Sequence, residues 1–509
     1  MSKLDLLVIA PSARGLYQDL AKDFSAKEPN IWAGLLANAV RWWSYDVAIY
    51  DMEIECPDAN TFYKVVEEYD PKVVLFVVTG QNPNASTAAM AGATASSAII
   101  GSMPWTSTSV PWKIAFVGPH VNALPIQTLE AHPEIDIVFT NEGVYALKNV
   151  LETHISDLDL KDVKGIAYRD SSGDIRINPP EKIVPQESLG HDLPGVAYDL
   201  MPSLDNYRTS SWHANYHDAD RSPFASIYTS LGCIFQCEFC MINIINRTDN
   251  DPNKASANFN KFRYWDPEFT IKQLDYLAEQ GVKQIKVADE MWVLKPKHFM
   301  TLCDLIIERQ YDFNIWAYTR IDTIKPHYLE KLKAAGVNWL APGIEAGNQE
   351  IRREITKGKF EDINIREVVK MIQDADINVG ANYIFGLGHD TWDSMQETLN
   401  LALELNTENA NMYCATSLPG SPLYLKAISE GWESPCSYEG YGFLAYDHLP
   451  SRTYSLSARE VLAFRDYAFH TYFESPRFLN MINNKFGQPA VDNIKKMTSI
   501  KLKRKLLHG

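Results

Sequence analysis

Short apolar runs alternate with longer amphipathic segments through the first 150 residues of the chain. The runs hold Val, Ile and Leu at consecutive positions, as expected for strands that are buried on both faces. Residues 31–43 and 88–100, which lie between runs, have helical patterns. This order predicts an α/β domain with a doubly wound parallel sheet over residues 1–150. The predicted strands are residues 4–11, 45–51, 71–79, 113–118 and 135–140.

A second series of strand and helix patterns runs from residue 224 to residue 425. Six strand-like segments recur at fairly even spacing, and polar residues follow several of them. In barrels built from such units, catalytic groups gather at the carboxyl ends of the strands. The pattern therefore predicts a second α/β domain with its functional groups at that edge. The predicted strands are residues 224–230, 281–288, 312–319, 337–345, 378–386 and 409–416.

The segment 151–223 has the pattern of a hairpin and a linker. Residues 165–177 predict a β-hairpin that turns at residues 170–173, and prolines follow it. We expect this connector to act either as a strap that sets the distance between two cofactors or as a plain linker.

The C-terminal part, residues 426–509, is mainly helical by pattern. Ser457 and Glu460 have capping-box spacing, which predicts a helix running to about residue 473. The basic segment 495–505 predicts a solvated helix end, with contact to an anionic substrate or a membrane surface as the alternative.

Composition narrows the function classes. A chain of 509 residues predicts two to four domains. Its 48 basic and 64 acidic residues give a net charge of −16, which disfavours binding to nucleic acid. The first ten residues predict a buried strand and not a signal peptide, and no apolar run reaches the roughly 18 residues of a membrane helix. The seven cysteines do not form a disulfide framework, so we expect a reducing cytoplasm.

Three of those cysteines lie within eight residues. Cys233, Cys237 and Cys240 follow the predicted strand 224–230 with C-x3-C-x2-C spacing. Three thiolates form a soft, compact ligand set that suits an iron–sulfur cluster or zinc and not a hard cation. A structural zinc site needs four ligands. Zinc would therefore require a distant histidine here, whereas a cluster held by three cysteines keeps one iron open.

The spacing Cys-x3-Cys-x-aromatic-Cys, with Phe239 as the aromatic residue, resembles the signature of the radical S-adenosylmethionine (SAM) enzymes. The resemblance implies a [4Fe–4S] cluster whose open iron binds SAM and cleaves it reductively to a 5′-deoxyadenosyl radical. It also implies that the six strand–helix units form a partial (β/α)6 barrel, and that the C-terminal part covers its mouth. A plain covering layer is the alternative for that part.

The resemblance carries over to residues at the strand ends. Residues 288–290 occupy the place of the family's Gly-Gly-Glu motif, with both glycines replaced, and imply that Glu290 accepts a hydrogen bond from the SAM amino group. Glu345 resembles the residue that holds the ribose. Ile384 and Gly386 resemble the segment beside adenine, with Phe239 on the same base. For both glutamates, a solvated surface carboxylate is the alternative. Arg320 and Asp322 predict either a substrate clamp or a structural ion pair; we assign no catalytic residue.

Three loops of the N-terminal domain have unusual chemistry: residues 79–87, 118–120 and 141–143. The first is rich in Gly, Asn, Ser and Thr and precedes a helix of small residues, so a bulky polar ligand can approach its backbone. No G-x-G-x-x-G motif follows a strand, which disfavours a dinucleotide. The domain resembles the cobalamin-binding domain of cobalamin-dependent radical SAM enzymes. The implied cobalamin contacts are Thr79, Gly80, Asn82, Ser86, Thr87, Gly118, His120, Glu142 and Gly143.

A D-x-H-x-x-G motif is absent. The absence predicts that no histidine is the lower axial ligand of cobalt, which favours methyl transfer. A sheet that kept the fold but lost cobalamin, or that binds another nucleotide, is the alternative. The resemblance thus implies a cobalamin-dependent methyltransferase that moves a methyl group from SAM, through methylcobalamin, to an unactivated carbon of a small molecule.

A radical cyclase or rearrangement enzyme with the same cofactors, and a non-catalytic cobalamin or iron–sulfur sensor, are the alternatives. A methylthiotransferase is disfavoured because no second cysteine triad exists. The resemblance further implies an electron donor such as flavodoxin or ferredoxin. The substrate cannot be read from the sequence.

Overall fold

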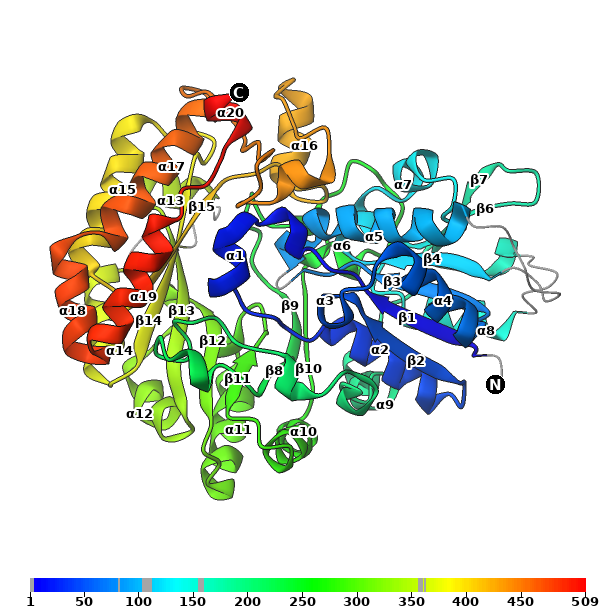
Figure 1. The fold of residues 1–509 in the computed structure, drawn as a ribbon, viewed down its shortest axis with the longest axis horizontal. Coiled ribbons are helices and arrows are strands. Elements are labelled where there is room, and N and C mark those ends of the chain that lie inside the picture. The colour runs from blue at the N-terminus through cyan, green and yellow to red at the C-terminus, as the bar shows by residue number, and fades with distance from the viewer. Residues whose placement is uncertain (1–3, 81–82, 103–111, 154–159, 356–359, 361–362) are drawn as a thin grey trace.

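The computed structural model describes residues 4–80, 83–102, 112–153, 160–355, 360 and 363–509. Figure 1 shows two α/β bodies side by side, the first in blue and cyan and the second in green and yellow, with orange and red helices packed on the second. Each body is built around its own sheet. The predicted α/β class, with an N-terminal sheet domain and a partial barrel, is confirmed. Within the described residues, no helix is long and apolar enough to cross a membrane.

The N-terminal sheet has seven strands in the order β2-β1-β3-β4-β5-β6-β7. Its first five strands are parallel, as predicted. In this order β1 lies next to β3. From this pair the sheet grows in opposite directions, to β2 on one side and to β4 and β5 on the other. The five strands are β1 (Leu6–Ala10), β2 (Val47–Asp51), β3 (Val73–Val77), β4 (Lys113–Val117) and β5 (Ile137–Phe139).

Helices cover both faces of this sheet, which explains why its strands are apolar at consecutive positions. Leu6 and Val8 pack into a core on one face with α2 and α8, whereas Leu7 and Ile9 pack on the other face with α4 and α5. The helices of this half are α1 (Gln18–Phe24), α2 (Ile31–Trp42), α3 (Met52–Glu55), α4 (Ala59–Tyr69), α5 (Ser86–Ser102), α6 (Pro119–Ala123), α7 (Pro125–Ala131), α8 (Val144–Glu152) and α9 (Leu189–Asp192).

The predicted hairpin is part of this sheet and does not stand in a free connector. Strand β6 (Ile166–Arg169) pairs antiparallel with β5, and β7 (Ile175–Ile177) forms the edge. Ile166 and Ala167 are fully buried, so the hairpin needed a partner to cover it. The sheet therefore extends to residue 177, beyond the boundary at 150 that the sequence indicates.

The second sheet has six parallel strands in the order β15-β14-β13-β12-β11-β8, and its two edge strands do not pair with each other. This is the partial barrel that the resemblance to radical SAM enzymes implies. Its strands are β8 (Phe224–Ile227), β11 (Gln284–Val287), β12 (Asn314–Arg320), β13 (Val337–Glu345), β14 (Asn378–Phe385) and β15 (Asn409–Cys414). Its helices are α10 (Pro267–Glu279), α11 (Pro296–Arg309), α12 (Pro326–Ala334), α13 (Gln349–Ile355), α14 (Ile365–Asp374), α15 (Trp392–Leu405) and α16 (Pro422–Ser429).

Tryptophans fill the half of the barrel lumen that lies near the amino ends of the strands. Trp316 and Trp339 contact Trp212 of the connector, with ring centroids 5.2 and 5.0 Å apart.

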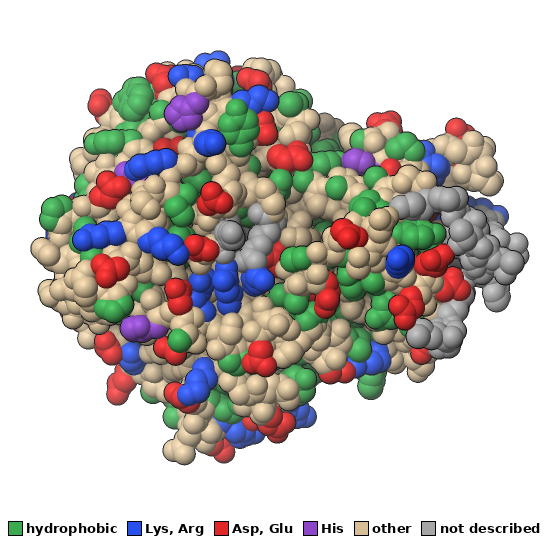
Figure 2. Space-filling view, in the orientation of Figure 1, with side chains coloured by type: hydrophobic (Ala, Val, Ile, Leu, Met, Phe, Trp, Pro, Cys, Tyr) green, Lys and Arg blue, Asp and Glu red, His purple; other side chains and the backbone are tan. Residues whose placement is uncertain are grey.

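The C-terminal helices are α17 (Ala458–Phe473), α18 (Pro476–Phe486), α19 (Gln488–Ser499) and α20 (Lys505–His508). Helix α17 begins with the predicted capping box, in which Ser457 and Glu460 bond reciprocally. Figure 2 shows acidic and basic side chains interspersed over the view, with Lys and Arg side chains gathered beside a central hollow.

Candidate active site

The cysteine loop begins where a short antiparallel ribbon ends. Strand β9 (Ser230–Cys233) pairs with β10 (Lys261–Tyr264), a ribbon that the sequence did not indicate. Gly232 has φ +80°, and a Cβ there would lie 2.2 Å from the Lys261 carbonyl oxygen. Asn243 then holds the loop: its Oδ1 accepts from the Cys233 N–H at 3.0 Å, and its Nδ2 donates to the Cys233 carbonyl at 2.8 Å. The turn therefore depends on glycine and on one amide side chain.

The three thiols are recessed in this loop, and burial raises the pKa of each. The pKa of Cys233 rises to about 11 and that of Cys237 to about 12, while that of Cys240 rises well above its ordinary value. Only a strong Lewis acid would hold all three as thiolates.

Arg320 stands beside the cysteine loop at the end of β12. Its guanidinium lies 3.5 Å from the centre of the Phe235 ring, and its Nε donates to Asp322 at 2.7 Å. The charge of Arg320 opposes the rise in the pKa of Cys233 and Cys237. Of the two alternatives for Arg320 and Asp322, the structure shows the ion pair. The positive charge of Arg320 lies where thiolates would form.

Glu290 and Glu345 are half-buried carboxylates at the carboxyl ends of β11 and β13. Neither accepts a hydrogen bond from the part of the chain that the structure describes. Burial raises the pKa of Glu290 to about 8 and that of Glu345 to about 7. Glu345 also has φ +66°, a conformation that is uncommon outside glycine and is found at functional sites. Asp289, by contrast, accepts from Thr229 and Ser230 and holds the turn between β8 and β9.

The residues predicted beside adenine come together from distant parts of the chain. Phe239 and Ile384 belong to one apolar cluster beside the cysteine loop. Gly386 has φ +80°, and its N–H donates to Asp390 at 3.0 Å. The cluster provides an apolar surface beside the cysteine loop, and contact with adenine stays a prediction.

The first loop of the N-terminal sheet reaches a large cavity. Thr79 and Gly80 line it; the Thr79 hydroxyl donates to Asn30, and the Gly80 N–H donates to Ser86. A Cβ on Gly80 would lie 2.5 Å from the Ala85 Cβ. Asn82, also predicted to contact cobalamin, lies outside the described residues. Thr79 and Gly80 are thus held at the cavity by Asn30 and Ser86.

The other predicted cobalamin contacts mostly bond within the protein. His120 is buried with Nδ1 3.2 Å from the Thr87 hydroxyl, and burial lowers its pKa to about 3. Glu142 forms a buried ion pair with Arg263 at 2.6 Å. Gly118 and Gly143 have φ of +144° and +82°. Gly118 and Glu142 line a smaller hollow beside the cavity.

The large cavity, about 330 Å³, lies between the two sheets. It opens at the carboxyl ends of β1 and β3, the point where the N-terminal sheet changes direction, and this is where open α/β sheets bind ligands. Sequence reasoning missed most of its wall, because the wall is assembled from α2, β15, α17 and several loops, which are far apart in the sequence and carry no motif. Those residues include Tyr17, Glu28, Trp32, Tyr228, Asn411, Met412, Tyr413, Phe443, Arg465 and Phe469.

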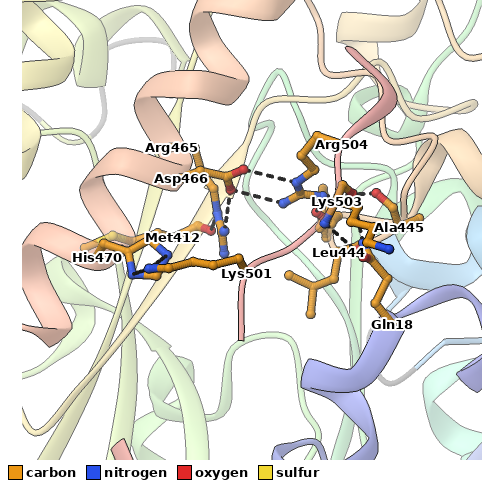
Figure 3. A network of polar contacts seen from close by, with 11 residues as sticks. Gln18, Met412, Leu444, Ala445, Arg465, Asp466, His470, Lys501, Lys503 and Arg504 are labelled. Carbon is orange, nitrogen blue, oxygen red and sulfur yellow. Dashed lines mark hydrogen bonds and ion pairs between the residues drawn. The ribbon is translucent and has the colours of Figure 1, made fainter. Parts of the chain in front are cut away.

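The C-terminal tail holds one wall of this cavity in place (Figure 3). Arg504 is fully buried and bonds to Asp466 and to the carbonyls of Phe443 and Ala445. Gln18 joins the Leu444 carbonyl to the backbone of Lys503. The sequence indicates a solvated helix end here; that expectation is wrong for Arg504, because the tail folds back over the barrel.

Comparison with known proteins agrees with this geometry. Residues 227–402 match the family model of the radical SAM superfamily. An uncharacterized methyltransferase of Pyrococcus horikoshii, PH0819, is 27% identical over 409 residues, which cover 79% of each chain.

Two solved structures share the whole architecture. TsrM of Kitasatospora setae, a radical SAM methyltransferase solved with tryptophan and a SAM analog, has a TM-score of 0.67 at 13% identity over 97% of this chain and 99% of its own. OxsB, a cobalamin-dependent SAM radical enzyme solved with aqua-cobalamin and SAM, has a TM-score of 0.63 at 16% identity over 98% and 70%. The barrel of this chain therefore matches the radical SAM superfamily over residues 227–402, and the chain has the two-domain fold of TsrM and OxsB.

Proposed function

We propose that the chain is a cobalamin-dependent radical SAM methyltransferase that adds a methyl group to an unactivated carbon of a small molecule. One observation carries the proposal. A hollow between the domains is lined both by Thr79 and Gly80 of the N-terminal sheet and by Gly232 and Glu290 of the barrel. The regions suited to cobalamin and to SAM therefore share a wall, so that a substrate between them can reach both.

The residues present fit the cofactors. Cys233, Cys237 and Cys240 provide the thiolates of a [4Fe–4S] cluster, and Glu290 and Glu345 offer carboxylates without internal partners to the amino and ribose groups of SAM. Small residues line the N-terminal side of the large cavity and leave space for a bulky ring; they are Ala10, Ala13, Gly80, Ala85 and Ala89.

When bound, these groups supply reductive cleavage of SAM to a carbon radical and a carrier for a second methyl group. The chain's own residues hold and shield them. Arg320 favours the thiolate form of the cysteines. Phe443 and Phe469 line the cavity, and their apolar rings would restrict water around a radical formed there. Electrons would come from a donor such as flavodoxin or ferredoxin.

The test is anaerobic turnover of the reconstituted protein with trideuteromethyl SAM, a reductant and a small-molecule extract of the source cells. We expect 5′-deoxyadenosine, S-adenosylhomocysteine and a product that carries the labelled methyl group. The Cys233→Ala protein, treated identically, is the control and should give none of them. An isomerised or dehydrogenated product without label would contradict methyl transfer, and absence of 5′-deoxyadenosine would contradict radical catalysis.

A further inference from the structure

A carboxylate of the N-terminal domain reaches the barrel lumen. Glu28 lies in the loop between α1 and α2, and its Oε2 is 2.7 Å from Nζ of Lys286 on β11. The Ser226 hydroxyl of β8 donates to the same oxygen at 3.0 Å. The side chains of Lys286 and Glu28 are only 1% and 11% exposed. Glu28 thus stands inside the barrel although 258 positions separate it from Lys286.

The loop that carries Glu28 is held firmly. Arg221 is buried and donates to the carbonyls of Asp23 and Ser25 at 2.7 and 2.8 Å. Lys27 and Arg208 exchange two backbone hydrogen bonds, at 2.8 and 3.0 Å. A carboxylate fixed on both sides keeps its direction before any ligand arrives, which is what a binding site requires.

One oxygen of Glu28 has no partner. Oε2 accepts both bonds, and Oε1 accepts none from the described residues. Two more polar groups on the cavity wall have the same property within the described chain. The Tyr228 hydroxyl makes no hydrogen bond although the residue is 8% exposed, and the Asn411 Oδ1 accepts none although its Nδ2 donates to Asn382. Glu28, Tyr228 and Asn411 all line the large cavity.

The positive charges of this wall are already neutralised. Lys286 is paired with Glu28, and Arg465 donates to the Met412 carbonyl and to Asp466. The cavity is further lined by the carboxylates of Asp51 and Glu53. An anionic group that enters here would meet several carboxylates and no unpaired cation on the described wall. No favourable contact would therefore offset the free energy that its desolvation costs.

We propose that Glu28, with Tyr228 and Asn411, binds an amino or hydroxyl group of the substrate. The substrate class is a compact molecule with an apolar body, which packs on Met412 and Phe443, and a donor group that is cationic or neutral. Phosphorylated and carboxylated molecules of the same size are excluded at this position. This inference rests on the proposed function only in calling the bound molecule a substrate. The binding preference itself can be measured without turnover.

The experiment measures binding of three matched probes to the anaerobically reconstituted holoenzyme by calorimetry. The probes are phenethylamine, phenethyl alcohol and 3-phenylpropionate, which share one apolar body and differ in the end group. We expect the amine to bind at least about tenfold tighter than the carboxylate, with the alcohol between, because a charge-assisted hydrogen bond has that magnitude. Equal affinities, a reversed order or no binding of any probe would overturn the proposal.

Variants separate recognition from a purely structural ion pair. Glu28→Gln leaves Lys286 as the local charge and should shift the preference toward 3-phenylpropionate, whereas Lys286→Met should keep the preference for the amine. Breaking a buried pair can prevent folding. The double variant Glu28→Gln/Lys286→Met removes both charges and should lose most of the amine preference, with only the smaller contribution of Asp51 and Glu53 remaining. Retention of the full wild-type preference in that protein would overturn the role of Glu28.

The matched control is Asp312→Asn, which breaks the exposed ion pair with Lys283 outside the cavity and should leave the order of the probes unchanged. Failure of this inference and of the proposed function are distinguishable. A protein that prefers the amine but transfers no labelled methyl group contradicts the proposed function alone. A protein that transfers the label without the preference contradicts the role of Glu28 alone.

Discussion

Both sheets carry polar residues at the carboxyl ends of their parallel strands, but the two sheets use these residues differently. In the N-terminal sheet, Glu142 is bonded to Arg263, and His120 lies against Thr87. In the barrel, Glu290 and Glu345 accept no hydrogen bond from the described chain. The difference shows which motif residues maintain the protein's own architecture and which are available to a ligand. The following predictions test that distinction, from the largest effect to the smallest.

Replacing Cys233, Cys237 and Cys240 by Ala should abolish the cluster completely, because no other soft ligand set stands beside this loop among the described residues. Iron and sulfide analysis and the visible absorbance of the reconstituted protein measure the loss. Cys303→Ala, at a buried cysteine on α11, is the control and should keep the cluster. Full iron and sulfide in the triple variant would refute the site.

Glu142→Ala should destabilise the fold by about 3–5 kcal/mol, because it leaves the Arg263 guanidinium buried without its partner. Urea denaturation measures the change. The variant Glu142→Gln, which can still accept from Val184, should lose less. If the stability of the variant is unchanged and cobalamin binding is lost, Glu142 binds the ligand and does not maintain the fold.

Arg504→Ala should lower the free energy of unfolding by about 2–3 kcal/mol, because a buried guanidinium with four hydrogen bonds is removed. Denaturation and limited proteolysis of the tail measure the effect. Lys505→Ala breaks only an exposed pair with Asp447 and should change little. If both variants behave alike, the tail does not hold the cavity wall.

Glu290→Gln and Glu345→Gln should each weaken SAM binding at least about tenfold while leaving the fold as stable or more so, since a charge-assisted bond to SAM is lost and no internal bond is. Equilibrium dialysis of SAM against the cluster-loaded protein measures affinity. Glu350→Gln, exposed in α13, is the control. Unaltered SAM affinity in both variants would show that these carboxylates serve another group.

The cofactor-free protein should lose stability as the pH rises toward about 8. Burial raises the pKa of Glu290 from 4.5 to about 8, so the folded chain binds more protons than the unfolded chain between those values. The stabilising contribution is complete below pH 4.5 and is lost as the pH passes through about 8. Denaturation across this range should give a flatter profile for Glu290→Gln; parallel profiles would contradict the shift.

Local patterns were enough for the elements and for the cysteine loop. Consecutive apolar positions predicted the parallel strands because both faces of the sheets are covered, and Cys233, Cys237 and Cys240 are close in space because they are close in sequence. The hairpin at residues 166–177 was recognised but misplaced, since pairing with β5 depends on which edge is open. The role of Arg504 was missed for the same reason: a local pattern cannot show where a tail folds back.

By itself, the sequence determined the α/β class, the order of the two sheets along the chain and the grouping of three cysteines in one loop, all of which depend on short spacings and on hydrophobic period. Only the tertiary structure decided which polar residues face ligands. Glu142 meets Arg263 across 121 positions, whereas Glu290 accepts no hydrogen bond from the described chain, so no local pattern distinguishes a neutralised carboxylate from an available one. Whether a buried charge is partnered depends on the packing of distant segments, and that packing exists only in the folded chain.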